Sequence, residues 1–332
     1  MPTTDATPAP ESSAPHVPAF VATTGGHLVQ LYLMAPVLEP DRHEDALWIT
    51  HRTPQSESML EGRNVAYIPP IHARQWHTVL GRTPQVLAAM RRHHVDTVYS
   101  TGAALALAAL PAARLVGARP RYIESLARSD QPSLAGRVLE RVPWVPVFTQ
   151  YPENATGRWQ YDRSLLDSFE VEDGGTPRPP GRVFVTLGTT RPWQFRRLVE
   201  RMLAILPPET EVVWQTGVTD VSDLPIDARP MLSDEEFRAE IARADVVVTH
   251  SGCGTFMRCL EAGRIPIMVP RRAAHQEHVD DHQEQIATVA DRRGLAIMRE
   301  VDDLSLEDLL LATGVRARPA DLTARRHHEE AR

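Results

Sequence analysis

Residues 245–283 constrain the fold of this chain more than any other stretch. They begin with the apolar, β-branched run 246–248, which predicts a buried strand, and continue into a turn at 249–255 that contains two glycines. A helix-compatible segment, 256–263, follows directly. A helix that begins at a glycine-rich turn directs free N–H groups and a positive end at one point. The stretch therefore predicts a phosphate-binding site.

The same strand, turn and helix unit occurs near the start of the chain. Residues 20–22 predict a short strand, residues 23–27 a glycine turn, and residues 28–38 a buried helix. Further strand and helix signals alternate through the sequence, with strands expected at 46–50, 65–69, 97–100, 121–123, 145–149, 183–187, 212–216 and 294–298. Such alternation indicates parallel sheets covered by helices, hence an α/β fold with Rossmann-like domains.

The length of 332 residues favours two domains, because single cores rarely grow beyond about 250–300 residues. A break is expected where glycine and proline concentrate between the two sets of strand signals. The predicted divisions are a disordered tail at 1–17, an acceptor-side domain at 18–171, a linker at 172–181, a donor domain at 182–313 and a C-terminal tail at 314–332. Ligands of parallel sheets bind beyond the strands' carboxyl ends, so a cleft between the domains is the expected site.

Composition narrows the range of partners. The net charge of -7 gives no general attraction to nucleic acid, so no nucleic-acid partner is expected. Two cysteines are too few for a disulfide framework and fit a reducing cytoplasm. Residues 12–38 lack charged side chains, but prolines and glycines interrupt them, so at most a peripheral membrane contact is expected. The early acidic residues do not fit a signal peptide.

Several short motifs carry a family resemblance. Val-Thr-Leu-Gly-Thr at 185–189, Thr-His-Ser-Gly-Cys-Gly-Thr at 249–255, Ile-Met-Val-Pro-Arg at 267–271 and the segment 277–283 resemble the donor domain of GT-B glycosyltransferases. The relevant GT-B enzymes are those related to the peptidoglycan N-acetylglucosaminyltransferase and, closer still, the catalytic subunit of the dolichol-linked UDP-GlcNAc transferase with its bacterial exopolysaccharide homologues. Gly-Gly-His at 25–27 and the segment 123–128 resemble the partner subunit of the same enzymes.

This resemblance implies a natural fusion of two subunits, with two Rossmann-like domains facing across a cleft and no obligate partner subunit. It implies a nucleotide-diphosphate sugar donor, usually a UDP-sugar, bound by the second half, and a lipid-linked acceptor held by the first. The implied reaction is inverting and needs no metal or other cofactor. No Asp-x-Asp motif ends a predicted strand, which agrees with the absence of a metal. The implied setting is exopolysaccharide or cell-surface glycan synthesis in the cytoplasm or at the inner face of the plasma membrane.

The resemblance and the chemistry of the glycine turns together predict the binding residues. The acceptor-side residues are Gly25, Gly26 and Arg128. The donor-side residues are Gly188, Thr189, His250, Ser251, Gly252, Gly254, Thr255, Arg271, His278, Asp281, His282 and Gln283. Asp281, His282 and Gln283 match the family's sugar-reading position, where carboxylate and amide groups suit sugar hydroxyls. A plain helix cap is the alternative reading of Asp281.

The attacking acceptor hydroxyl must lose a proton, so the cleft needs a general base. His27, between a strand and a helix, is the first candidate and Glu124 the second. A purely positional role in the glycine turn is the alternative for His27.

Arg258 departs from the family pattern, because related enzymes often carry an acidic residue there that binds the ribose. The simplest reading of Arg258 is an ion pair with Glu261; contact with a phosphate or with a different base is the functional reading. Two functional alternatives stay open: transfer to a soluble small molecule, and a non-catalytic module that only binds nucleotide sugars. 

Overall fold

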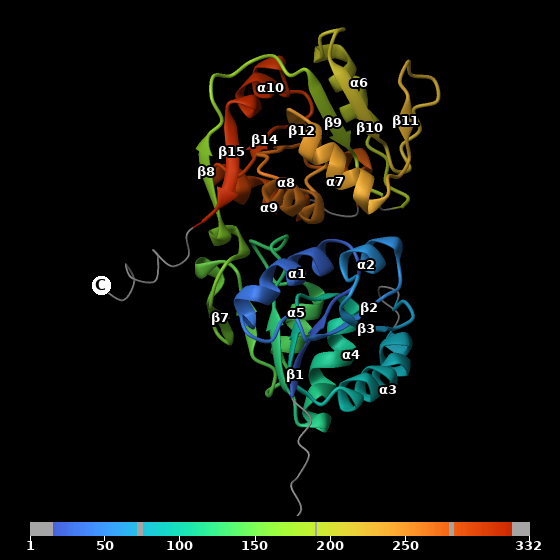
Figure 1. The fold of residues 1–332 in the computed structure, drawn as a ribbon, viewed down its shortest axis with the longest axis vertical. Helices are drawn as coiled ribbons and strands as arrows, with labels where there is room; N and C mark the ends of the chain where they lie inside the picture. The colour runs from blue at the N-terminus through green and yellow to red at the C-terminus, as the bar shows by residue number, and fades with distance from the viewer. Residues whose placement is uncertain (1–15, 72–75, 190, 279–281, 321–332) are drawn as a thin grey trace, which may run out of the picture.

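A computed structural model describes residues 16–71, 76–189, 191–278 and 282–320 of the chain. Two α/β domains are stacked along the long axis, with the N-terminal domain below and the C-terminal domain above in the view of Figure 1. Each domain is built on a parallel sheet with helices packed against it, as the alternating sequence signals predict.

The N-terminal sheet has seven parallel strands in the order β3-β2-β1-β4-β5-β6-β7. Its β1 strand is almost completely buried, because parallel strands covered on both faces need uninterrupted apolar residues. The elements of this domain are β1 (Val17–Val21), α1 (Gly26–Leu38), β2 (Leu47–Thr50), α2 (Pro54–Met59), β3 (Asn64–Tyr67), α3 (Trp76–Arg92), β4 (Val95–Ser100), α4 (Ala103–Ala113), η1 (Arg114–Val116), β5 (Arg119–Ile123), α5 (Leu134–Glu140), β6 (Val147–Thr149), η2 (Pro152–Asn154), β7 (Trp159–Tyr161) and η3 (Leu165–Ser168).

The C-terminal sheet has six parallel strands in the order β11-β10-β9-β12-β13-β14. All four residues of β12 are buried, as the apolar run 246–248 predicts. The elements of this domain are β9 (Arg182–Thr186), α6 (Arg196–Ile205), β10 (Glu211–Gln215), β11 (Ala228–Arg229), α7 (Asp234–Arg243), β12 (Val246–Thr249), α8 (Cys253–Glu261), β13 (Ile267–Met268), η4 (Ala273–His275), α9 (His282–Arg292), β14 (Ile297–Met298) and α10 (Leu306–Thr313).

Three predicted boundaries differ from the secondary structure. The expected tail at 314–332 contains the strand β15 (Val315–Pro319), and the expected linker at 172–181 contains the end of β8 (Phe169–Asp173). These two strands pair antiparallel, with Arg316 opposite Glu172 and Arg318 opposite Glu170. Glycine and proline indicated a linker at 172–181, and the polar composition after residue 313 indicated a tail, although Ala317 is buried. At the other end, the expected tail at 1–17 loses Val17, which begins β1.

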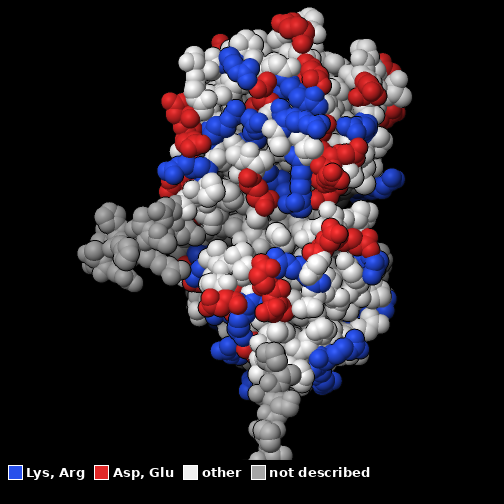
Figure 2. Space-filling model, in the orientation of Figure 1, with Lys and Arg blue, Asp and Glu red and all other residues white. Residues whose placement is uncertain are grey.

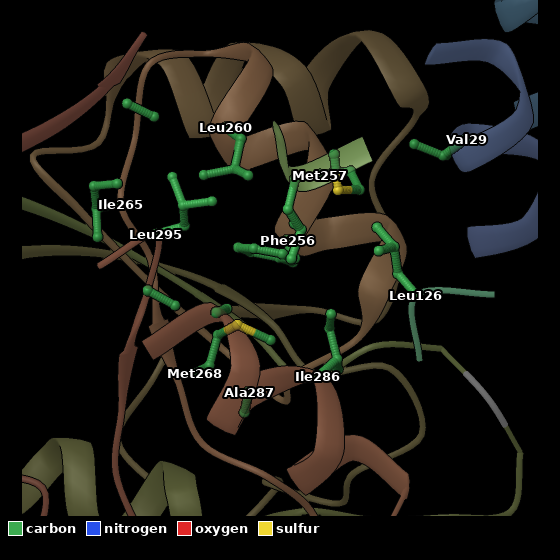
Figure 3. Packing of buried hydrophobic residues seen from close by; sticks show 14 of the residues in the cluster. Val29, Leu126, Phe256, Met257, Leu260, Ile265, Met268, Ile286, Ala287 and Leu295 are labelled. Atoms are coloured by element: carbon green, nitrogen blue, oxygen red, sulfur yellow. The ribbon is translucent and has the colours of Figure 1, made fainter. Parts of the chain in front are cut away.

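One apolar core continues from the first domain into the second. Figure 3 shows Phe256 and Met257 of α8 beside Ile286 of α9, with Val29 of α1 and Leu126 at the edge of the same cluster. An ion pair between Asp167 and Arg293 at 2.7 Å also joins the two halves. The domains are therefore in direct contact along α1 and α8.

We predict that replacing buried Ala317 by Asp lowers the free energy of unfolding by about 2–4 kcal/mol, because a carboxylate would lose its water without gaining a partner. Urea denaturation measures this. The control Arg318→Ala, which removes only a half-exposed ion pair, should cost no more than about 1 kcal/mol. If both changes left the free energy of unfolding almost the same, residues 314–319 would not be packed against the domain.

Candidate functional site

The strand orders define one topological switch point in each domain. In the N-terminal sheet, the order in which the chain adds strands reverses between β1 and β4. In the C-terminal sheet, it reverses between β9 and β12. Helices leave in opposite directions at such points, so the loops after these strands form the crevice where ligands of open α/β sheets bind. His27 follows β1, Gly188 follows β9 and His250 follows β12. The residues predicted from sequence therefore lie at both switch points.

The two glycine turns meet across the domain boundary. A Cβ atom on Gly26 would lie 3.4 Å from the backbone nitrogen of Gly254, and one on Gly254 would lie 3.3 Å from the Gly26 Cα. The N-cap residues of α1 and α8, Gly25 and Gly252, have no side chain that could cap the first turn, and the Gly25 N–H donates to Gln55 Oε1 at 2.7 Å. Two positive helix ends with free N–H groups thus converge on one spot, which favours an anion there.

His27 has the geometry of a neutral base. Its Nδ1 lies 2.9 Å from the carbonyl oxygen of Thr101 and, because a carbonyl only accepts, Nδ1 carries the proton. The Thr101 hydroxyl donates in return to the His27 carbonyl at 2.9 Å. Burial lowers the pKa of His27, and the positive charge of Arg128 lowers it further. The Nε2 atom is thereby left as an unprotonated acceptor at neutral pH.

Glu124, the second candidate base, is buried in the loop after β5. Its buried carboxylate accepts hydrogen bonds from the Ser125 N–H at 3.0 Å, the Ser133 N–H at 2.9 Å and the Tyr122 hydroxyl at 3.0 Å. The Ser133 hydroxyl adds a fourth bond at 3.1 Å. Burial raises the pKa of Glu124. These contacts make Glu124 the anchor of the loop that leads into α5.

The ring of His250 fills the space between two glycines. A Cβ on Gly188 would lie 2.5 Å from its Nε2, and a Cβ on Gly252 would lie 2.4 Å from the same atom. Burial lowers the pKa of His250 to about 3, and the charge of Arg271 adds to the effect. The imidazole is therefore neutral, and it shapes the turn without contributing positive charge. Its contact also explains why residues 188 and 252 are glycines.

Ser251 combines a strained backbone with a buried hydroxyl in the turn after β12. Its backbone has a positive φ of 62°, which is strained for a residue other than glycine. The side chain is 1% exposed, and its hydroxyl has no hydrogen-bond partner among the residues that the structure describes. Thr255 adds a second hydroxyl in the first turn of α8. A phosphate oxygen would satisfy the Ser251 hydroxyl and the N–H groups beside it.

Arg271 lies behind the glycine turn of β9. The guanidinium is 1% exposed and donates to the Leu187 carbonyl oxygen, and the backbone N–H of Arg271 donates to Gln283 Oε1 at 3.2 Å. Burial lowers the pKa of Arg271 to about 10, so the group stays charged at neutral pH. Arg271 and Gln283 thus hold the end of β9, the end of β13 and α9 together, and they support the site from the inside.

The structure describes some of the remaining predicted donor residues but not all of them. Thr189 is exposed after the Gly188 turn, and the His278 ring stacks on Trp193 with 6.0 Å between the ring centres. Asp281 and the side chain of His282 lie outside the described residues. The sugar-reading role of this segment therefore stays a prediction.

Arg258 is a buried cation on α8, only 7% exposed. It pairs with Glu261 at 3.2 Å, as the simplest reading of the sequence predicts, and it also approaches Asp234 at the start of α7 at 3.6 Å. Burial raises the pKa of Glu261.

Sequence reasoning missed one positioning residue, Gln30. Its amide nitrogen donates to the Gly26 carbonyl at 3.2 Å and to the Ser125 hydroxyl at 3.1 Å, while its oxygen accepts from the Leu126 N–H at 2.9 Å. Gln30 thereby ties the first glycine turn to the loop after β5. The signal was present in the sequence, because it is a buried amide in an otherwise apolar helix.

The described part of the chain contains neither a metal-binding cluster nor a membrane-spanning helix. No set of three or more His, Cys, Asp or Glu side chains there is arranged to hold a metal ion. Likewise, none of the helices in the described ranges has the length and apolar character required to traverse a bilayer.

Comparison with known sequences and folds defines the class of protein. Residues 182–316 match the family described as Glycosyltransferase family 28 C-terminal domain, which coincides with the domain that carries Ser251 and Gly254. The chain has two Rossmann-like domains, and the second one matches this family, so the fold is GT-B. These findings together indicate a glycosyltransferase.

Three similar proteins share one name, which states their function. The UDP-N-acetylglucosamine--N-acetylmuramyl-(pentapeptide) pyrophosphoryl-undecaprenol N-acetylglucosamine transferase of Albidiferax ferrireducens is 27% identical over 251 residues, which cover 69% of this chain and 61% of that protein. The Ralstonia nicotianae protein of the same name is 29% identical, over 73% of this chain and 69% of that protein. The Xanthomonas euvesicatoria protein is 27% identical over 89% of this chain and 72% of its own length, so one relative aligns with both halves. These alignments give no support to a fusion of two subunits.

Solved structures confirm the fold. MurG of Acinetobacter baumannii has a TM-score of 0.54 at 20% identity and covers 89% of each chain. The spinosyn forosaminyltransferase SpnP has a TM-score of 0.55 at 15% identity, over 89% of this chain and 88% of that chain. At these identities the likeness concerns the fold alone.

The contact of His250 with two glycines gives a prediction about coupling. Gly252→Ala should lower the free energy of unfolding by about 1–3 kcal/mol, because its Cβ would overlap the ring. In the double variant Gly252→Ala/His250→Ala the overlap disappears. The two changes should therefore be non-additive by about 1 kcal/mol or more in a double-mutant cycle measured by thermal unfolding. Strict additivity would mean that the ring does not occupy this place.

A second prediction concerns His27 as base. His27→Ala should reduce kcat about 10²–10⁴-fold and leave nucleotide binding intact, because only proton removal is lost. Burial and the charge of Arg128 lower the pKa of His27 below the ordinary value of 6.5. The wild-type kcat/KM should therefore be constant above pH 6.5 and should decrease only at a lower pH, where His27 becomes protonated. Unchanged turnover in the variant would remove His27 from the mechanism.

Proposed function

We propose that this chain transfers a sugar from a nucleotide-diphosphate sugar, a UDP-sugar in the first place, to a hydroxyl of a lipid-linked saccharide in exopolysaccharide or cell-surface glycan synthesis. The convergence of α1 and α8 at Gly26 and Gly254 carries the proposal, because it offers a diphosphate two positive helix ends from two domains. The names of the curated relatives support it, since they give a UDP-sugar donor and an undecaprenol-linked acceptor for those proteins.

The proposed reaction is a direct displacement with inversion. The donor diphosphate binds at the two turns, where the Ser251 hydroxyl and the first N–H groups of α8 hold its oxygens. His27 Nε2 takes the proton of the acceptor hydroxyl as that oxygen forms a bond to the anomeric carbon. The bond from this carbon to the diphosphate breaks on the opposite face, and the nucleoside diphosphate leaves. Helix-end N–H groups stabilise the charge that develops on it, so no metal ion is assigned a step.

The proposed setting follows from the same arrangement. Both halves of the cleft belong to one chain, so no partner subunit is needed to complete it. A lipid-linked acceptor would bring the protein to the inner face of the plasma membrane as a peripheral protein. On the face drawn in Figure 2, charges of both signs are interspersed over the two domains, which gives no reason to expect a nucleic-acid partner.

Arg258 bears on the identity of the nucleotide. In the relatives' pattern this place suits an acid that binds ribose, whereas Arg258 engages Asp234 and Glu261 here. We propose UDP as the donor nucleotide with ribose held by other groups of this cluster, of which Glu261 is partly exposed.

A donor screen by thermal shift tests the proposed function. A nucleotide that binds only the folded state stabilises it by about 2.7 kcal/mol at 100 times its Kd, which raises Tm by several degrees. UDP and UDP-sugars should give the largest shifts. Larger shifts with GDP or TDP would contradict UDP as the nucleotide, and no shift with any nucleotide would contradict a glycosyltransferase.

Acceptor assays separate the alternatives. Transfer to lipid-linked saccharides and activity that requires lipid support the proposal. Transfer only to a soluble acceptor would assign the chain to small-molecule glycosylation, and nucleotide-sugar binding without hydrolysis or transfer would make it a binding module.

A further inference from the structure

The turn at residues 100–103 holds the side chain of His27 from the neighbouring strand. β1 and β4 are adjacent in the sheet, with Val21 opposite Ser100, so the turns that follow them lie side by side. His27 Nδ1 donates to the Thr101 carbonyl oxygen, and the Thr101 hydroxyl donates to the His27 carbonyl oxygen, both at 2.9 Å. Thr101 is completely buried, so water does not compete for its hydrogen bonds. The two turns are therefore joined at the residue that carries the candidate base.

Gly102 lies against the His27 ring at Cε1. A Cβ atom on Gly102 would lie 3.1 Å from His27 Cε1 and 3.3 Å from the Tyr122 hydroxyl oxygen, and both distances are shorter than ordinary packing contacts. Gly102 also has a φ of 125°, which favours glycine, and Ala103 after it has a strained φ of 61°. Space and backbone conformation therefore both require a glycine at position 102.

Tyr122 supports this turn from β5, where it lies opposite Ser100. The side chain is buried, and its hydroxyl donates to Glu124 Oε1 at 3.0 Å and lies 3.1 Å from the Ser133 hydroxyl oxygen. The Tyr122 hydroxyl is thus held on two sides, whereas His27 is only half-buried. A methyl group at position 102 would therefore displace the His27 ring, by a few tenths of an ångström, more readily than the Tyr122 hydroxyl.

These contacts set the direction and the tautomer of the His27 ring. A half-turn about the Cβ–Cγ bond would put the carbon Cδ2 in the place of Nδ1, and the hydrogen bond to Thr101 would be lost. Because a carbonyl oxygen only accepts, Thr101 selects the tautomer with the proton on Nδ1 and leaves Nε2 as an acceptor. Gly102 against Cε1 limits the tilt of the ring.

We propose that the turn at residues 100–103 positions the candidate base, with Thr101 and Gly102 as positioning residues that act through His27. This inference rests on the proposed function and adds to it the residues that hold Nε2 where the acceptor hydroxyl loses its proton. Placement matters for proton transfer, because a displacement of about 1 Å can cost about 100-fold in rate. Glu124, the second candidate base, contributes indirectly here, since it holds the Tyr122 hydroxyl.

NMR of the histidine ring nitrogens in the full chain tests the positioning without any substrate. The signals of His27 are those that disappear in His27→Ala. In wild type at neutral pH, Nδ1 should give the signal of a protonated nitrogen and Nε2 that of an unprotonated one. Gly102→Ala should move both signals toward the average of two exchanging tautomers, because the displaced ring loses its bond to the Thr101 carbonyl.

Gly117→Ala is the matched control for backbone strain. Gly117 also has a positive φ, of 77°, but a Cβ atom there would have nothing within 4 Å. The replacement therefore strains the backbone in the same domain without touching the His27 ring. It should leave the His27 signals as they are in wild type.

Turnover separates a positioning role from a general loss of structure. The probes are UDP-N-acetylglucosamine and undecaprenyl-diphosphate-linked N-acetylglucosamine in detergent micelles. Gly102→Ala should lower kcat about tenfold when His27 is present. In the His27→Ala background it should change the residual kcat less than about twofold, because no ring is left to displace. Gly117→Ala should change kcat less than about twofold in both backgrounds.

Thr101 provides a second variant in case Gly102→Ala does not fold. Thr101→Val keeps the volume but removes the hydroxyl that donates to His27, and it should lower kcat about fivefold, as expected for one hydrogen bond. Thr101→Ser keeps the hydroxyl and should restore kcat to within about twofold of wild type.

Two results would overturn the inference. One is wild-type His27 signals in both Gly102→Ala and Thr101→Val, and the other is an equal loss of kcat from Gly102→Ala with and without the His27 ring. Failure of the proposed function looks different, because wild type would then show neither a thermal shift with nucleotides nor transfer. The NMR signals would still decide whether the turn holds the ring.

Discussion

The approach of two helix N-termini, α1 at Gly26 and α8 at Gly254, is the contact on which the candidate site depends. Each helix alone offers a partial positive charge and a few free N–H groups, which is a weak attraction for an anion in water. Where the two helix N-termini meet at the domain boundary, their partial positive charges attract the same anion, and less water lies between them to weaken that attraction. A Cβ at residue 26 or 254 would lie 3.4 Å or 3.3 Å from the facing backbone, so a side chain at either position would push the two turns slightly apart.

Burial gives the histidines of the site an unexpected electrostatic role. The pKa of His27 and that of His250 are both lowered by burial, so neither supplies the positive charge that a diphosphate needs. Attraction then comes from helix ends, and the neutral rings serve other purposes. His27 keeps an acceptor nitrogen for a proton, and His250 fills the space that Gly188 and Gly252 leave. Arg271, the one fully buried cation named above, holds the Leu187 carbonyl behind the turn.

The alternation of apolar runs and glycine turns was enough to predict the two sheets, their central strands and the site turns. Periodicity could not predict β8 and β15, because their stability comes from pairing with each other and from Glu–Arg contacts between segments far apart in sequence. For the same reason sequence patterns predicted His27 and Ser251 as neighbours of a ligand but not Gln30, whose hydrogen bonds to Ser125 and Leu126 join α1 to the loop after β5. Arg271, which was predicted on the donor side, is buried and donates to the Leu187 carbonyl, a contact that the sequence did not predict.

Hydrogen–deuterium exchange of backbone amides with and without a saturating nucleoside diphosphate tests the central claim most directly. If the diphosphate binds between the two helix ends, amides of both turns, at residues 25–28 and 252–256, should exchange more slowly in the complex, because ligand oxygens accept hydrogen bonds from one or both sides and close the contact. Slowed exchange confined to the second turn would place the anion on one domain only. Unchanged exchange in both turns would contradict a diphosphate site at this contact.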